Sequence, residues 1–141
     1  MLGVSTSWRS EILNSGKEIV EEILSLGVQA VEVEYRMSKA MLKEILPMVE
    51  AGEIAVTSVH NIVPRPRRIP KEYADGEFVY LSAENERERL SAVKYATGTM
   101  EWAEKVGAPG VVLHMGKVRM DGVTEFLREI YDDGRIRSDE A

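Results

Sequence analysis

The sequence alternates four times between a short apolar run and a longer stretch with helical periodicity, and this alternation limits the folds open to the chain. The four runs are "LGVST" (2–6), "AVEVEY" (30–35), "EIAVTSVH" (53–60) and "VVLHM" (111–115). Runs of this length that are rich in β-branched residues are typical of buried strands. Strands that alternate with helices pack as a parallel sheet covered by helices, so we predict an α/β fold.

Helix signals follow the first two runs. After the first run we predict a helix over Gly16–Leu26, since Ser15 and Glu18 have the spacing of a capping box. After the second run, residues 38–52 carry apolar side chains at helical spacing. Pro47 lies within this stretch, and a proline costs about 3 kcal/mol inside a helix. We therefore expect the second helix to kink or restart at Pro47.

A long irregular segment separates the third run from the longest predicted helix. Residues 61–82 contain three prolines, which argue against a continuous helix or strand there. Ser82 is then the expected cap of a helix that runs to about Val106. A last helix is expected at about 123–133. The positions of the long helix that recur at helical spacing are Leu90, Val93, Ala96 or Thr97, Met100 and Ala103.

Length and composition describe one ordinary globular domain. The 141 residues are 44% apolar and 30% charged, and we treat 1–141 as a single domain. No apolar run approaches the ~20 residues of a membrane span, and "MLGVSTSW" lacks the layout of a signal peptide. The absence of cysteine excludes disulfides, thiolate nucleophiles and cysteine-ligated metals. We therefore expect a cytoplasmic protein without a membrane partner.

The charge balance bears on the remaining partners. The chain has 18 basic and 24 acidic residues, and the net charge of −6 argues against a nucleic-acid partner. A local basic cluster is present all the same. One interpretation of it is an anion clamp for a phosphate or carboxylate, and the other, which we favour, is a solvated loop that pairs with acidic neighbours. The cluster consists of Arg65, Arg67, Arg68 and Lys71.

Both histidines of the chain lie at the carboxyl end of an apolar run. His60 ends "EIAVTSVH", and His114 lies near the end of "GAPGVVLHMGK". Because the carboxyl ends of parallel strands form the binding face of such arrays, we expect both side chains at one polar mouth. Adjacent strands are about 4.8 Å apart, which lets two such imidazoles reach one ligand. Histidines there can bind a divalent metal, hydrogen-bond a hydroxylated ligand or move protons.

Three further side chains are candidates for the same mouth. Strand alternation places Glu32 and Glu34 on one face of the second run. We expect one of the two carboxylates to face the mouth and the other to pair with a loop arginine. Trp8 follows the first run, where its ring is expected to form a wall against a sugar.

Three segments carry a resemblance to a known superfamily. "GVQAVEVE", "AVTSVHN" and "AEKVGAPGVVLHMG" resemble the second, third and fourth strand regions of the xylose isomerase-like barrels. That superfamily includes sugar phosphate isomerases and epimerases and the endonuclease IV group. The resemblance implies a (β/α)8 TIM barrel with a divalent metal (Mn, Mg, Co or Zn) at its mouth. In the endonuclease branch, histidines matching His60 and His114 belong to a zinc cluster, whereas in the sugar branch these positions line the substrate pocket.

The chain matches only the N-terminal half of such a barrel. A TIM barrel takes about 250 residues, and this chain has about four of the eight units. The principal metal ligands and acid/base carboxylates of the family come from later strands, so no residue here is assigned a catalytic role. We expect a metal-dependent sugar or sugar-phosphate isomerase or epimerase that is incomplete as given, with a sugar or sugar phosphate as its small-molecule partner.

Two alternatives remain open at this point. The first is a zinc-dependent abasic-site endonuclease of the same fold. The second is a non-catalytic half-barrel that pairs with a partner chain, since an uncovered inner face and sheet edge call for another chain or the missing C-terminal half.

Overall fold

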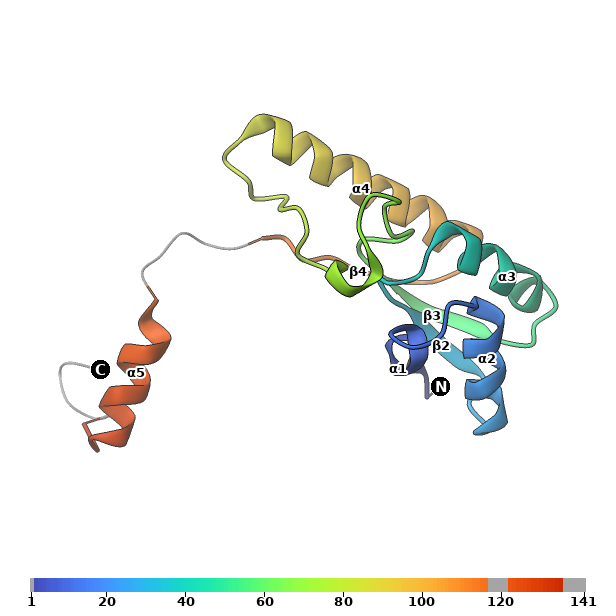
Figure 1. The fold of residues 1–141 in the computed structure, drawn as a ribbon, viewed down its shortest axis with the longest axis horizontal. Helices are drawn as coiled ribbons and strands as arrows, with labels where there is room; N and C mark the ends of the chain where they lie inside the picture. The colour runs from blue at the N-terminus through green and yellow to red at the C-terminus, as the bar shows by residue number, and fades with distance from the viewer. Residues whose placement is uncertain (1, 117–121, 136–141) are drawn as a thin grey trace.

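The computed structural model describes residues 2–116 and 122–135 and contains one parallel sheet (Figure 1). Its strands are β1 (Val4–Ser5), β2 (Ala30–Val33), β3 (Ala55–His60) and β4 (Val111–Val112), in the spatial order β1-β2-β3-β4. All three neighbouring pairs are parallel. The predicted α/β architecture with helices between parallel strands is therefore confirmed. The strands are shorter than the apolar runs, and β1 and β4 have only two residues each.

The helices follow the strands in chain order. α1 (Ser7–Ser10) and α2 (Gly16–Ser25) lie between β1 and β2, and α3 (Lys39–Glu50) lies between β2 and β3. Ser15 caps α2 as expected, because its Oγ accepts a hydrogen bond from the Glu18 N–H at 3.2 Å. α3 continues through Pro47, so the expected restart is not observed. Pro47 lies in the last turns of α3, where one missing N–H interrupts little of the helix.

The long helix α4 (Glu86–Lys105) begins later than predicted. Asn85, and not Ser82, is its cap: Asn85 Oδ1 accepts from the Glu88 N–H at 3.1 Å. The Ser82 N–H instead donates to the Met115 carbonyl at 2.9 Å, which holds Ser82 outside the helix. The preceding segment is irregular as predicted, apart from the 3₁₀ turn η1 (Lys71–Tyr73). After β4, the chain forms α5 (Val123–Asp132), close to the predicted bounds.

The hydrophobic core lies between the sheet and helices α2, α3 and α4. Val31 and Val33 of β2 and Val56 and Val59 of β3 face these helices and are buried. The β2–β3 register is irregular between Val31 and Glu32: Val31 pairs with Val56 and Glu32 with Ser58, so Thr57 is skipped. Alternation is thereby interrupted, Val56 and Val59 face the same side, and the other face carries Glu32, Ser58 and His60. The helix residues of this core include Ile19 and Ile23 from α2, Leu42 and Ile45 from α3, and Trp102 and Ala103 from α4.

The buried face of α4 matches the predicted one in part. Ala96 and Ala103 of the predicted stripe are buried, whereas Leu90, Val93 and Met100 are about half exposed. The side chains that α4 buries are mostly small, which allows the helix to approach its neighbours closely. They are Ala92, Ala96, Thr99, Trp102 and Ala103. Within the described residues, no helix is both long and apolar enough to cross a membrane.

Candidate functional site

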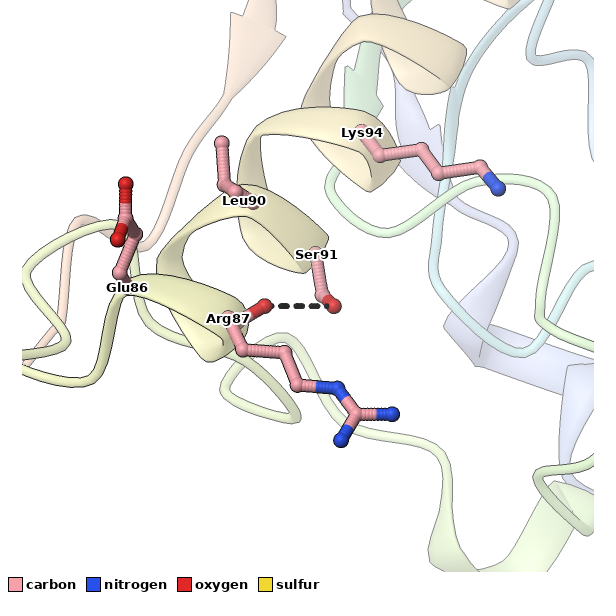
Figure 2. Close-up of a pocket in the computed structure, with 5 residues that line it drawn as sticks. All are labelled: Glu86, Arg87, Leu90, Ser91 and Lys94. Carbon is pink, nitrogen blue, oxygen red and sulfur yellow. Dashed lines mark hydrogen bonds between the residues drawn. The ribbon is translucent and has the colours of Figure 1, made fainter.

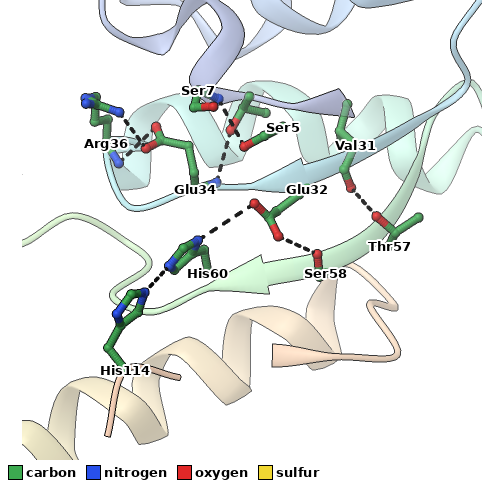
Figure 3. Close-up of polar contacts among 11 residues, drawn as sticks. Ser5, Ser7, Val31, Glu32, Glu34, Arg36, Thr57, Ser58, His60 and His114 are labelled. Atoms are coloured by element: carbon green, nitrogen blue, oxygen red, sulfur yellow. Dashed lines mark hydrogen bonds and ion pairs between the residues drawn. The ribbon is translucent and has the colours of Figure 1, made fainter. Parts of the chain in front are cut away.

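Four side chains form a row at the carboxyl edge of the sheet. Glu32 Oε1 lies 3.7 Å from His60 Nδ1, and His60 Nε2 lies 2.7 Å from His114 Nε2 (Figure 3). His114 Nδ1 in turn lies 3.7 Å from Glu77 Oε1. The two imidazoles therefore face each other through Nε2, and each turns Nδ1 toward a carboxylate. We call Glu32, His60, His114 and Glu77 the histidine row.

The sheet register explains how His60 meets His114. His60 is the last residue of β3 and pairs with Val112, the last residue of β4. The Asn61 N–H donates to the Val112 carbonyl at 2.9 Å, which holds the segments after β3 and β4 together beyond the paired residues. His114 follows Val112 by two residues and returns to the same edge. The prediction that both histidines reach one place is thus matched by the geometry.

Glu32 is oriented by its neighbour on β3. The register sets Glu32 opposite Ser58, and the Ser58 hydroxyl donates to Glu32 Oε2 at 2.9 Å (Figure 3). This leaves Oε1 for His60. The ring of Tyr35 meets the His60 ring edge-on, with the ring centroids 5.4 Å apart. His60 is therefore fixed on two sides, by a carboxylate and by an aromatic ring.

Two neutral imidazoles have too few N–H groups to supply a hydrogen to every contact of the row. A neutral imidazole has one N–H and one bare nitrogen. The contact between the two Nε2 atoms needs one N–H, so the ring that supplies it has a bare Nδ1 facing a carboxylate. Burial lowers the pKa of His60; Glu32 opposes this effect and His114 adds to it. The lowered pKa favours the neutral form of His60. If both rings are neutral, one contact of the row is unsatisfied.

The donor set of the row suits a divalent cation in part. Imidazole nitrogen is a common ligand of zinc and of other first-row metals. Two nitrogens bound to one tetrahedral metal are about 3.3 Å apart, so the 2.7 Å pair would open slightly to admit a metal. Among the described residues, no group of three or more His, Asp or Glu side chains is arranged to hold a metal. Further ligands would have to come from outside this set.

Glu34 does not join the row. Its side chain is buried, and its carboxylate accepts from the Arg36 backbone N–H at 3.0 Å and from the Arg36 guanidinium at 3.1 Å. The Glu34 N–H donates to Thr6 Oγ1 at 3.0 Å. Burial raises the pKa of Glu34, and the Arg36 charge opposes that shift. Glu32 and Glu34 are thus the two different carboxylates that we expected, one at the mouth and one paired with an arginine.

Trp8 and the basic loop lie elsewhere. Trp8 is on α1 with 60% of its surface exposed, and none of its described contacts joins it to the row. Lys71 donates to the Leu13 carbonyl at 3.0 Å and to Asn14 Oδ1 at 2.8 Å. Arg65 donates to the Arg36 carbonyl at 3.2 Å and to the Ile69 carbonyl. Arg65 and Arg67 also line a cavity of about 320 Å³ at the start of α3, with Ser38, Lys39 and Ala40.

Four cavities lined by described residues have no member of the histidine row in their lining: they lie along the first turns of α4, beside Tyr35 and Phe78, at the start of β3 and at the start of α3. One of the largest, about 380 Å³, lies along the first turns of α4 (Figure 2). Its lining is a helix surface whose one drawn hydrogen bond joins Ser91 Oγ to the Arg87 carbonyl at 3.0 Å. It holds no pair of titratable groups in contact. We therefore take the histidine row, and not this cavity, as the candidate functional site.

Glu77 is the member of the row that sequence reasoning missed. It lies in the irregular segment before α4, where strand alternation makes no prediction. Only the long-range contact with His114 shows its place.

Comparison of the chain with family models, with curated proteins and with solved structures gives no match.

Proposed function

We propose that this chain carries one side of the site of a metal-dependent sugar or sugar-phosphate isomerase or epimerase. We also propose that its βα units form half of a (β/α)8 barrel. The observation that carries the proposal is the pair of facing imidazoles, each backed by a carboxylate, at the carboxyl edge of a parallel sheet. In α/β folds of this kind, ligands bind at that edge.

The carboxylates support a cation between the imidazoles. If both Nε2 atoms give their lone pairs to a metal, both Nδ1 atoms carry hydrogen and both point at a carboxylate. The contact that is unsatisfied in the neutral, metal-free pair is then satisfied on both sides. Carboxylates behind metal-bound histidines are a common arrangement, which fixes the tautomer and the orientation of the ring. The row also brings two carboxylate side chains to one place, and carboxylates attract a divalent cation.

The chain's own residues have definite tasks in such a site. Glu32 and Ser58 hold the ring of His60, so that its Nε2 points to the ligand. His60 and His114 then bind the cation or donate to the hydroxyl groups of a sugar. A divalent metal, when bound, polarises a substrate carbonyl or hydroxyl, and this favours removal of a proton from the neighbouring carbon. The group that removes this proton belongs to the part of the barrel that these residues do not include.

The sheet also supports the barrel. Its strand order follows the chain order, and β1 and β4 are the two edges. The polar face that carries Glu32, Ser58 and His60 has no helix of the core packed on it. In a closed barrel this face becomes the interior and both edges are paired.

Two measurements test the proposal. Calorimetric titration of the chain with Co²⁺, Mn²⁺ and Zn²⁺ should show binding that His60→Gln and His114→Gln each weaken at least about tenfold. A change at the exposed Tyr73, Tyr73→Ala, serves as the control and should leave binding unchanged. The complete protein that contains these residues should then interconvert aldose and ketose sugars, or epimerise them, only with metal. Binding that does not depend on either histidine would overturn the proposal, and metal-dependent nicking of abasic DNA without sugar activity would replace it with the endonuclease.

A further inference from the structure

The ring of His114 is held by the loop that precedes α4. Glu77 Oε1 faces its Nδ1 at 3.7 Å. On the neighbouring residue, a Cβ built at Gly76 would lie 2.9 Å from His114 Cδ2 and 3.0 Å from Nε2. The ring therefore packs against the Gly76 backbone in space that no other residue type leaves free.

The arrangement around His114 repeats that around His60. In both cases a carboxylate oxygen lies 3.7 Å from Nδ1 and leaves Nε2 to face the other ring. The two carboxylates have different origins, because Glu32 comes from strand β2 and Glu77 from an irregular loop. The two imidazoles are nearly parallel, at 12° between planes. Each histidine thus has a carboxylate facing its Nδ1, although the two carboxylates come from unrelated parts of the fold. This similarity indicates that the two rings serve the same function.

We infer that Glu77 is a positioning residue for His114 and that the loop before α4 is part of the ligand site. This inference rests on the proposed function and deepens it. Glu77 acts through His114: its carboxylate lies 3.7 Å from Nδ1, beyond hydrogen-bond distance, and favours a hydrogen on Nδ1 electrostatically. This leaves the Nε2 lone pair for a divalent cation. It does not contact the cation, because it lies on the far side of the ring.

The loop is anchored well enough for this role. The Glu77 N–H donates to Asp75 Oδ1 at 2.9 Å, which fixes the turn that carries the carboxylate. Two residues later, Val79 is buried in a small cluster with Ile62 and Ala92. Ser82 then donates its N–H to the Met115 carbonyl, beside His114. The loop is thus tied to α4 and to the chain around His114.

The test compares Co²⁺ binding by the chain and by variants at Glu77. Carboxylates that orient metal-bound histidines typically contribute about 10- to 100-fold in metal affinity, so Glu77→Ala should weaken Co²⁺ binding by about that factor. Glu77→Asp should restore part of the loss, because it keeps the carboxylate. Glu72→Ala, at another acidic residue of the same loop, is the matched control and should not change the affinity. Gly76→Ala should weaken binding without changing any charge, since its Cβ displaces the ring.

A second readout needs no metal. The ¹⁵N shifts of the His114 imidazole report its tautomer, and Glu77→Ala should move the population toward the Nε2–H form. Wild-type Co²⁺ binding that is unaffected by His60→Gln and His114→Gln would count against the proposed function, while the tautomer shift would still test Glu77. Histidine-dependent binding with unchanged affinity and unchanged ¹⁵N shifts in Glu77→Ala and Glu77→Gln would overturn the role of Glu77 alone.

Discussion

Gly16 offers a sharp test of the packing between α2 and α3. It is buried at the start of α2, and a Cβ built on it would lie 2.2 Å from the Met41 carbonyl oxygen and 2.8 Å from the Met41 carbonyl carbon. Ordinary contacts begin near 3.4 Å, and the obstacle is backbone, which cannot rotate away. Gly16→Ala must therefore push the two helices apart by about 1 Å, at a cost typical of overpacking, about 1–3 kcal/mol.

Gly98 provides the matched control within the same chain. It lies inside α4, and a Cβ built there meets nothing within 4 Å. Glycine inside a helix costs about 0.5–1 kcal/mol relative to alanine, so Gly98→Ala should raise the free energy of unfolding by about that amount. The same chemical change at Gly16 and Gly98 should thus have opposite signs, with a difference of about 3 kcal/mol between the two variants.

Urea unfolding followed by circular dichroism measures this difference. With an m-value of about 2 kcal/mol per M, the midpoints of the two variants should be separated by about 1.5 M urea. The m-values should match that of the wild type, which shows that both variants unfold from the same compact state. A Gly16→Ala variant as stable as the wild type would refute the close approach of α2 to the Met41 carbonyl.

Three other changes probe the buried polar and apolar groups. Because burial raises the pKa of Glu34, the folded state binds the extra proton, and stability should fall as pH rises above about 4.5. Glu34→Gln should remove this pH dependence. Urea denaturation between pH 4 and 8 gives the free energy of unfolding of both proteins, and the same pH dependence in the two would contradict the prediction. Thr99→Val should lower the free energy of unfolding by about 1–3 kcal/mol. The buried Thr99 hydroxyl donates to Asn61 Oδ1 at 2.9 Å and accepts from the Val63 N–H at 3.0 Å, and valine can make neither bond. An unchanged thermal midpoint would contradict this prediction. Ile45→Ala should cost about 2–5 kcal/mol in urea unfolding because Ile45 is fully buried, and a loss below 1 kcal/mol would be inconsistent with that burial.

The parts of the fold that follow from local signals could be predicted from the sequence. Ser15 caps α2 through a bond to a residue three positions away, and such short-range geometry is visible in the residue spacing. Ser82 failed as a cap because its N–H bonds to Met115, a contact that no spacing reveals. The face of α4 was misjudged in part for a related reason. Leu90 and Val93 are the more hydrophobic residues, but α4 buries small side chains instead, including Ala96 and Ala103 of the predicted stripe.

The candidate site divides in the same way. Glu32 could be placed because it lies within β2, where alternation determines the face. Strict alternation would put His60 on the face of the buried Val56, and the irregular β2–β3 register turns it to the face of Glu32. Glu34 departs from that pattern because β2 ends at Val33 and the chain then turns toward Arg36. Glu77 had no regular element to locate it, and only the folded loop brings it to His114.

The strand order has a consequence for synthesis of the protein. Each strand pairs with the one before it in the chain, so a ribosome-bound chain can add each unit to an edge that already exists. A nascent chain that has emerged through His60 contains every residue of the β2–β3 ladder and of the hydrogen bond between Ser58 and Glu32. The contact between the two histidines must wait until His114 has emerged. Glu32 and His60 are therefore synthesised well before their partner, and the contact between the two histidines forms only when the fourth strand has docked.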